Sequence, residues 1–235
     1  MLRMTSLTVH VAENNAVNSA LLHLTAIDAD YGANADFHYV IGDVIAYCAD
    51  AAGCSDDDVT NSSGLFHVDP RSGMLSVTVS VDREKYLHFR VTIFAVDRGL
   101  PAQTGSAMVE VIVDDVNDRQ PTFLFPRDTT GNSNGGLELS VSEDATDGQL
   151  VGHLSAVDRD ATTTNNRVYY YFRSSRTSRQ PVKFVVDADT GEVRLRGRLD
   201  REHQSRYLMT AVATDSGRPA LAAVAQIVVK VLQSP

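Results

Sequence analysis

The stretch Val109–Pro121, which reads VEVIVDDVNDRQP, contains the two patterns that decide the fold. Its valines at positions 109, 111 and 113 alternate with other residues, and this period of two is typical of a half-buried β-strand. The strand pattern runs into the acidic cluster Asp115-Val116-Asn117-Asp118, which lies near the middle of the chain. Similar acidic clusters occur on both sides of it. We therefore expect the stretch to join two copies of one domain.

An internal repeat follows from residues that recur at a constant spacing. One set recurs 130 residues later: Glu13, Asp28 and Asp30 return as Glu143, Asp158 and Asp160. A second set recurs 118 residues later: Phe66, Asp69, Gly73, Asp82, Glu84 and Asp97 return as Phe184, Asp187, Gly191, Asp200, Glu202 and Asp215. Because 130 − 118 = 12, the first copy carries a net insertion of about a dozen residues between Asp30 and Phe66.

The period-two segments predict seven short strands in each copy. In the first copy they cover residues 7–11, 21–27, 37–41, 66–68, 74–77, 87–96 and 109–113. The segments Asp69–Gly73 and Asp187–Gly191 read as turns, and no stretch of a dozen residues has a helical period. We predict an all-β chain of two tandem seven-stranded Greek-key β-sandwiches, immunoglobulin-like, with domains at 1–118 and 119–235.

The net charge of −9 is unevenly distributed. Residues 1–118 hold 6 Lys and Arg against 17 Asp and Glu (−11), and residues 119–235 hold 15 against 13 (+2). No basic stripe with interleaved aromatic residues is present, which argues against a nucleic-acid partner. Basic residues crowd the middle of the second copy: Arg167, Arg173, Arg176, Arg179, Lys183, Arg194, Arg196, Arg198 and Arg201. They allow two interpretations, protection of strand edges against aggregation or contact with an acidic partner such as the first half of a neighbouring molecule.

Neither a membrane span nor a signal peptide can be read from the sequence. No apolar run approaches the roughly 18 to 20 residues that cross a bilayer, and Met1–Met4 lacks an apolar core. We expect a piece of a longer protein, whose targeting and anchoring segments lie outside this sequence.

The acidic residues at predicted strand ends suggest a cation site. Eight of them fall at the junction: Glu13, Asp82, Glu84, Asp115, Asp118, Asp158, Asp160 and Asp215. Two such charges about 4 Å apart repel by roughly 4 kcal/mol at an effective dielectric constant of 20. Many hard oxygen ligands, with the seven His residues dispersed elsewhere, suit Ca²⁺ better than Zn²⁺ or Mg²⁺. The pairs spaced i and i+2 lack an accompanying nucleophile or base, so we do not expect an enzyme.

With these motifs in order, the chain resembles two consecutive extracellular repeats of the cadherin superfamily. The motifs that carry the resemblance occur twice: Ala12-Glu13-Asn14, Asp28-Ala29-Asp30, Asp82-Arg83-Glu84, Ala95–Gly99 and Asp115–Arg119, then Ser142-Glu143-Asp144, Asp158-Arg159-Asp160, Asp200-Arg201-Glu202 and Thr214–Gly217. Classical cadherins exchange an N-terminal strand anchored by Trp, and this chain has no Trp. It is more similar to internal repeats of long non-classical cadherins of the protocadherin, Fat, Dachsous or tip-link type.

The resemblance implies three Ca²⁺ ions at the linker 115–119. The expected ligands are Glu13, Asp82, Glu84, Asp115, Asp118 and the Val116 carbonyl on one side, and Asn117, Asp158, Asp160, Asp215 and carbonyls of Arg119 and of Asn165 or Asn166 on the other. The family usually has Asn where this chain has Arg119, which contributes only a carbonyl. Outer half-sites at Asp28, Asp30, Asn34 and Asp97, and at Glu143, Asp200 and Glu202, would need flanking repeats to be complete.

The insertion in the first copy contains both cysteines and the one N-glycosylation sequon. We favour a disulfide between Cys48 and Cys54, with two free thiols as the alternative, and a glycan on Asn61 is allowed by Asn61-Ser62-Ser63. A protruding loop of this kind is a partner-binding feature or a tolerated surface insertion.

The resemblance implies calcium-dependent cell adhesion, with repeats that rigidify the ectodomain of a single-pass plasma-membrane protein and transmit force or present binding surfaces. Expected partners are other cadherin ectodomains, homophilic or heterophilic, and flanking repeats. The alternative function is ligand recognition or dimerisation through the inserted loop or the basic face of the second repeat.

Overall fold

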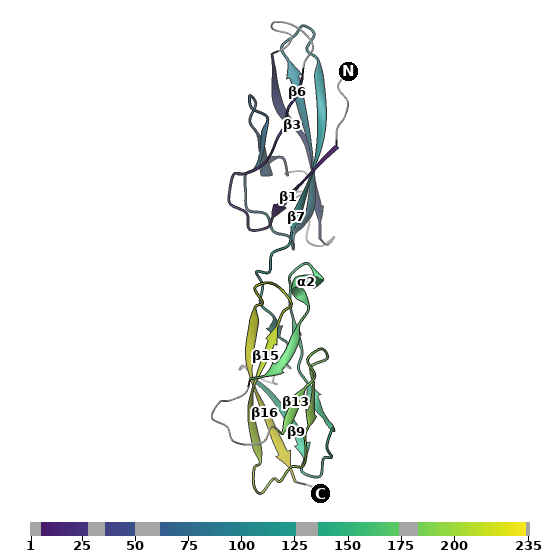
Figure 1. Cartoon of the computed structure of the whole chain (residues 1–235), viewed down its shortest axis with the longest axis vertical. Helices are drawn as coiled ribbons and strands as arrows, with labels where there is room; N and C mark the ends of the chain where they lie inside the picture. The colour runs from purple at the N-terminus through teal and green to yellow at the C-terminus, as the bar shows by residue number, and fades with distance from the viewer. Residues whose placement is uncertain (1–5, 28–35, 50–61, 126–135, 174–182, 234–235) are drawn as a thin grey trace. The chain divides into compact units, whose positions relative to one another are not determined.

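The structure is a computed structural model, and it describes residues 6–27, 36–49, 62–125, 136–173 and 183–233. Its internal contacts divide the chain into unit 1, Met1–Val116, and unit 2, Asn117–Pro235. Each unit is a two-layered β-sandwich (Figure 1). The all-β prediction of two tandem seven-stranded sandwiches is confirmed.

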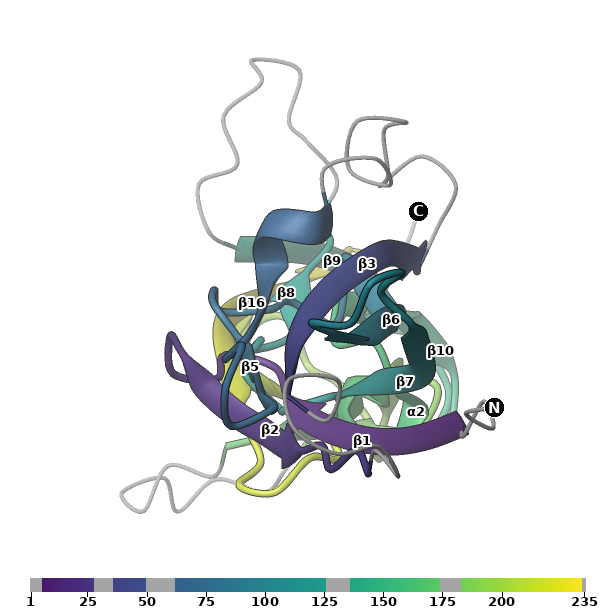
Figure 2. The same ribbon diagram turned by 90° about the horizontal axis from the view of Figure 1, so that it is seen from above.

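Unit 1 contains seven strands: β1 (Ser6–Ala12), β2 (Ser19–His23), β3 (Phe37–Cys48), β4 (Phe66–Val68), β5 (Met74–Val77), β6 (Tyr86–Asp97) and β7 (Thr104–Asp114). One sheet has the order β1-β7-β6-β3 and the other β2-β5-β4. Figure 2 shows these two layers end-on, with β2 and β5 facing β7, β6 and β3. Strand β1 pairs with β7 in parallel, and the remaining ladders are antiparallel.

Unit 2 repeats this topology. Its strands are β8 (Thr122–Phe123), β9 (Gly136–Ser142), β10 (Leu150–His153), β11 (Ala156–Val157), β12 (Tyr169–Phe172), β13 (Phe184–Val186), β14 (Glu192–Leu195), β15 (Arg206–Thr214) and β16 (Ala222–Leu232). The sheets have the orders β9-β16-β15-β12 and β10-β14-β13. Strands β8 and β11 form an additional two-stranded ladder that the sequence did not predict.

The core of each unit lies between its sheets and is built by the predicted alternation. Val109, Val111 and Val113 are at most 1% exposed, and they pack with residues of both sheets of unit 1. Ile227 and Val229 occupy the same positions in unit 2 and are fully buried. The period of two therefore identified the inward face of β7 and β16 correctly.

Three strand boundaries differ from the prediction by four residues or more. Strand β7 begins at Thr104 instead of Val109. Strand β2 ends at His23, and Ile27, which was expected at the end of that strand, is 87% exposed. Strand β3 was expected to end at Ile41 but continues to Cys48 through a register shift between Ile41 and Val44. Cys48 therefore ends a strand instead of lying inside the inserted loop, because part of the insertion extends the ladder with β6.

Helical structure in the described ranges is limited to the 3-10 turn η2 (Ser62–Leu65) and the single turn α2 (Thr163–Asn166). Within the described residues, no helix has the length and apolarity that a membrane span requires.

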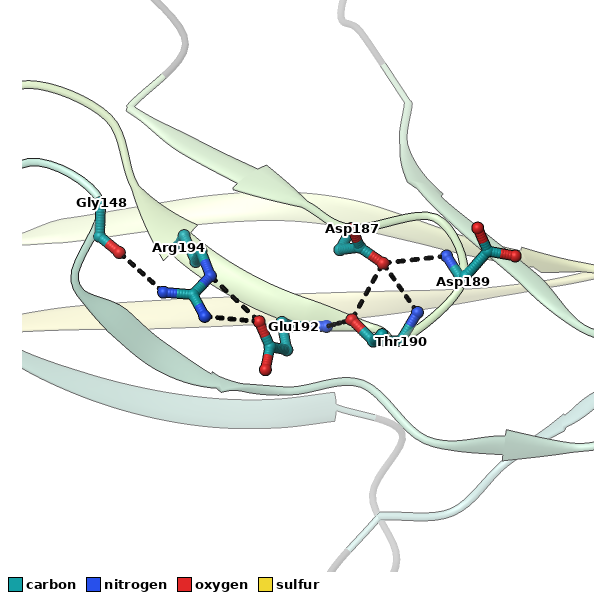
Figure 3. A network of polar contacts seen from close by, with 6 residues as sticks. All are labelled: Gly148, Asp187, Asp189, Thr190, Glu192 and Arg194. Atoms are coloured by element: carbon teal, nitrogen blue, oxygen red, sulfur yellow. Dashed lines mark hydrogen bonds and ion pairs between the residues drawn. The ribbon is translucent and has the colours of Figure 1, made fainter.

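Equivalent turns connect the short strands of the two units, as predicted. In unit 2, Asp187 Oδ1 accepts hydrogen bonds from Thr190 N at 2.8 Å and from Asp189 N at 3.1 Å (Figure 3). The Thr190 backbone bond, followed by that of the Thr190 hydroxyl, lowers the pKa of Asp187 below its ordinary value. Asp69 makes the same bonds with Ser72, which lower its pKa in the same way. The glycine that ends each turn has a φ of +73°, a conformation that favours glycine.

Candidate metal centre

Three carboxylates of unit 1 lie close enough together to hold one cation. Glu13 follows β1, and Asp82 and Glu84 lie in the loop between β5 and β6. One oxygen from each lies within 4.8 Å of the others. Glu13 is only 3% exposed, so its charge is largely removed from water. These three residues are among the ligands predicted for unit 1, and the predicted ligands Asp115 and Asp118 are not part of this close group.

Backbone amides hold these carboxylates in place. Glu13 Oε1 accepts a hydrogen bond from Val116 N at 2.7 Å, and Glu13 Oε2 accepts one from Arg83 N at 2.9 Å. Asp82 Oδ1 accepts a hydrogen bond from Glu84 N at 3.0 Å. Glu13 thereby connects the end of β1 to the ligand loop and to the segment after β7, and its rotamer is restricted by two partners.

Three predicted ligands of unit 2 are buried. Asp158, Asp160 and Asp215 are 8%, 3% and 3% exposed. Asp158 Oδ1 accepts a hydrogen bond from Asp160 N at 2.9 Å, and Asp160 Oδ1 accepts one from Arg119 N at 3.2 Å. Asp215 also accepts hydrogen bonds from Gly217 N and Leu221 N. Among the described residues, the carboxylate oxygens that lie close enough together to hold one cation are those of Glu13, Asp82 and Glu84, so the three acids of unit 2 stay predicted ligands.

Asn117 is held in one orientation by unit 2. Its Nδ2 donates hydrogen bonds to Asp215 Oδ2 at 3.1 Å and to Pro219 O at 2.7 Å. A Cβ on Gly217 would lie 2.2 Å from Asn117 Cγ, so only glycine leaves room for this amide. With both nitrogen bonds made, Oδ1 is buried and accepts no hydrogen bond from the described residues. A buried carbonyl oxygen of this kind is suited to a cation.

The donor set fits Ca²⁺. Besides Asn117 Oδ1, one buried carboxylate oxygen on each of Glu84, Asp158 and Asp160 has no hydrogen-bond donor among the described residues, although these residues have other polar contacts. Carboxylate and amide oxygens are the ligands that Ca²⁺ takes, in numbers of six to eight. No His or Cys belongs to either group, which disfavours Zn²⁺.

The other predicted ligands lie as follows. Asp115 is partly buried just after β7, and the exposed Asp118 has its Oδ1 3.8 Å from Arg119 Nε. Asn165 is buried in α2, and Asn166 Nδ2 donates a hydrogen bond to Asp160 O at 2.8 Å. The choice between the Asn165 and Asn166 carbonyls as a ligand stays a prediction.

The outer half-sites are described only in part. Asp97 is 7% exposed and its Oδ1 accepts hydrogen bonds from Gly99 N and Gln103 N. Asp200 Oδ1 accepts them from Glu202 N and His203 N, and Glu143 N donates to Leu232 O. Several predicted residues lie outside the described ranges: Asp28, Asp30, Asn34, Cys54 and Asn61. The disulfide and the glycan stay predictions.

Two residues important for the site were missed at the level of sequence. Asn15 Oδ1 accepts a hydrogen bond from Val81 N at 2.9 Å, while Asn15 Nδ2 donates to Val79 O at 3.0 Å, so Asn15 holds the segment that leads to Asp82. Pro219 supplies the carbonyl that orients Asn117. Asn15 directly follows the motif Ala12-Glu13-Asn14, but a contact 64 residues away has no signal in a single sequence.

Several basic residues of unit 2 have local partners. Arg194 donates hydrogen bonds to Glu192 Oε2 and to Gly148 O (Figure 3). Arg167 Nη2 lies 2.8 Å from Asp189 Oδ1, and Lys183 Nζ donates to Arg198 O. These contacts favour a structural role for the three side chains over a free basic surface.

Comparisons with known proteins agree with the motifs. The family described as "Cadherin domain" matches residues 7–114 and 137–232. The chain is 30% identical to human Cadherin EGF LAG seven-pass G-type receptor 1 over 96% of its length and 33% identical to mouse Protocadherin Fat 4 over 90%. It spans only 6% and 4% of those two proteins. A structure of protocadherin gamma B2 extracellular cadherin domains 3–6 matches 97% of this chain and 50% of that chain, with a TM-score of 0.79 and 27% identity.

Proposed function

Because this chain belongs to the cadherin family and carries two consecutive cadherin repeats, we propose that it is a Ca²⁺-binding segment of a membrane-anchored cell-adhesion protein. Its role is calcium-dependent stiffening of an ectodomain that carries force between cells or presents binding surfaces. The function is structural and non-enzymatic, as in the adhesion proteins it is similar to. The site's partners are Ca²⁺ and neighbouring cadherin repeats.

The observation that carries the proposal is the cluster of Glu13, Asp82 and Glu84, with oxygens within 4.8 Å of one another. Carboxylates at such distances repel by roughly 4 kcal/mol per pair at an effective dielectric constant of 20. A divalent cation reverses the sign of this energy. The buried Asn117 Oδ1 and the nearly buried Asp160 supply oxygen donors of the same kind in unit 2.

Bound Ca²⁺ would supply positive charge and fixed coordination geometry, and the protein residues would supply the order of the segment 115–119. Val116 N is already hydrogen-bonded to Glu13 in unit 1, and Asn117 Nδ2 is bonded to Asp215 in unit 2. Adjacent residues of one chain are thus committed to different units. Ca²⁺ bound to the ligands of each unit would restrain the chain on both sides of this short segment, which is the stiffening that we propose. The number of Ca²⁺ ions that we propose is three, as the resemblance to cadherin repeats implies.

The alternative function is recognition of a ligand or a second molecule through the inserted loop or the basic residues of unit 2. Most of the inserted loop lies outside the described residues. The local partners of Arg167 and Arg194 favour the calcium proposal over a free basic face.

Calorimetric titration with Ca²⁺, with small-angle scattering in Ca²⁺ and in chelator, tests the proposal. Glu84→Gln removes one ligand charge, and Glu110→Gln makes the same chemical change on β7, away from the ligands. We expect Ca²⁺ to bind the wild type and to raise its melting temperature. In small-angle scattering, Ca²⁺ should narrow the range of radii of gyration that the chain adopts. Glu84→Gln should weaken binding and Glu110→Gln should not. Equal binding by both variants, or scattering that is insensitive to Ca²⁺, would refute the proposal.

A further inference from the structure

The extension of β3 reaches the calcium-ligand loop of unit 1. Strands β3 and β6 run side by side through the sandwich (Figure 1), and their ladder continues from Val44 opposite Val91 to Cys48 opposite Tyr86. The residue after the strand, Ala49, donates a hydrogen bond from its backbone N to Lys85 O at 3.1 Å. Lys85 directly follows the ligand Glu84. The inserted residues therefore contact the chain one position beyond the ligand motif.

Lys85, which accepts the hydrogen bond from Ala49, also belongs to the hydrogen bonds that shape the ligand loop. Lys85 N and Tyr86 N both donate to Asp82 O, at 3.2 and 2.9 Å. Glu84 N donates to Asp82 Oδ1 at 3.0 Å. The Tyr86 ring packs 4.9 Å from the ring of the fully buried Phe89, which anchors the start of β6 in the core. The loop carrying two ligands is thus closed by its own bonds and restrained from outside by Ala49.

Unit 2 has the same loop with a shorter neighbouring strand. Gln204 N donates to Asp200 O at 2.9 Å, as Tyr86 N does to Asp82 O in unit 1. Within the described residues, β12 ends at Phe172, whose partner is Ala211, and its last bond is from Arg173 N to Thr210 O at 2.8 Å. This bond lies several residues away from Asp200–Glu202. Within the described residues, the backbone bond that restrains the ligand loop from the neighbouring strand occurs in unit 1.

We propose that the extended β3 is a positioning element for the metal site, in which Ala49 holds the Asp82–Glu84 loop in its ligand geometry. This inference rests on the proposed calcium function. The physical reason is preorganisation, since a loop already ordered in the free protein loses less conformational entropy when the cation binds. Ala49 bonds to Lys85, which is not a predicted ligand, and it acts on the metal site through this residue. The insertion then strengthens Ca²⁺ binding without contacting a partner molecule.

The test removes one hydrogen bond. Ala49→Pro deletes the donor N–H, and residue 48 before it is in a strand, the conformation that precedes proline most readily. Arg173→Pro deletes the corresponding strand-end bond of unit 2 and is the matched control. From the net strength of one such bond, we expect Ala49→Pro to weaken Ca²⁺ binding about two- to tenfold at the sites that Glu84→Gln affects. Arg173→Pro should leave these sites unchanged.

A second measurement needs no variant. Because coupling between two equilibria is reciprocal, Ca²⁺ should slow hydrogen exchange of the Ala49 amide in the wild type by a similar factor. The Gly148 amide, bonded to Leu195 O in unit 2, should not respond. The inference is overturned if Ala49→Pro binds Ca²⁺ as tightly as the wild type, or if exchange of the Ala49 amide does not depend on Ca²⁺. In that case Glu84→Gln would still weaken Ca²⁺ binding, and the proposed function would stand. If the wild type does not bind Ca²⁺, and Glu84→Gln accordingly leaves Ca²⁺ affinity unchanged, the proposed function itself fails.

Discussion

Replacing Glu13 by glutamine should destabilise unit 1 even when no calcium is present. The two Glu13 oxygens accept hydrogen bonds from different backbone amides, Val116 N at 2.7 Å and Arg83 N at 2.9 Å. A glutamine amide has one oxygen and one NH₂ group, so in either orientation one of the two backbone donors faces another donor. The side chain is 3% exposed, and water has little access to replace the lost bond.

The expected loss follows from the strengths of the two bonds. A hydrogen bond to a charged acceptor contributes about 1.5 to 3 kcal/mol, and the surviving bond weakens by about half because its acceptor becomes neutral. The sum is roughly 2 to 4.5 kcal/mol. Relief of the repulsion between Glu13 and the carboxylates of Asp82 and Glu84 acts in the opposite direction, so unfolding is measured in about 1 M salt, where a Debye length of about 3 Å screens that repulsion. With a urea dependence of about 2 kcal/mol per molar, the unfolding midpoint of unit 1 should fall by roughly 1 to 2 M.

The assay is urea unfolding in chelator, followed by amide signals of each unit because the chain has no Trp. The amides of Val109 and Val111 report on unit 1, and that of Val229 reports on unit 2. Glu110→Gln provides the matched control, because Glu110 lies half-buried on β7 and its Oε1 is 3.7 Å from His88 Nε2 instead of bonded to backbone amides of the ligand loop. A Glu13→Gln midpoint for unit 1 equal to that of Glu110→Gln would refute the argument, and so would an equal fall in both units.

Three further predictions concern unit 2. The pKa of Asp187 is lowered below 3.8 in the folded protein, so ionised Asp187 stabilises the fold above that pH, and this stabilisation is lost as the pH falls through the folded pKa. The difference in melting temperature between wild type and Asp187→Asn should therefore shrink below about pH 4. A difference that stays constant down to about pH 2.5 would contradict this. Gly217→Ala should displace the Asn117 amide, lower stability by about 1 to 3 kcal/mol and weaken Ca²⁺ binding, and a melting curve identical to wild type would exclude the clash. Phe184→Ala should destabilise the 1%-exposed core by about 3 to 5 kcal/mol in denaturant, whereas loss of the same size in Val185→Ala, at a 38%-exposed position, would show that burial is not the cause.

Much of the fold could be predicted because it depends on local patterns that occur twice. The alternation at Val109, Val111 and Val113 reports directly which side chains face the core, since successive residues of a strand point to opposite faces. The turns at Asp69 and Asp187 were also predictable, because an aspartate that accepts bonds from the next few amides acts within five residues.

The errors lie where tertiary pairing decides the length of a strand. Residues 42–48 have no clean alternation, because a register shift between Ile41 and Val44 interrupts it, yet pairing with β6 keeps them in the sheet. Ile27 fits an apolar strand pattern, but β2 ends at His23 and leaves it 87% exposed. In both cases the partner strand, absent from any local window, set the boundary.

The sequence by itself determined that the chain has two copies of one sandwich, and it predicted oxygen ligands on either side of the segment 115–119. Period, spacing and side-chain chemistry are properties of the chain order alone. Only the tertiary structure decided which of these ligands meet and what holds them. Glu13 reaches Val116 across 103 residues because β1 pairs in parallel with β7, and the Asn117 amide is oriented because Asp215 and Pro219 accept hydrogen bonds from its nitrogen. The physical reason is that strand register and buried hydrogen bonds set these distances.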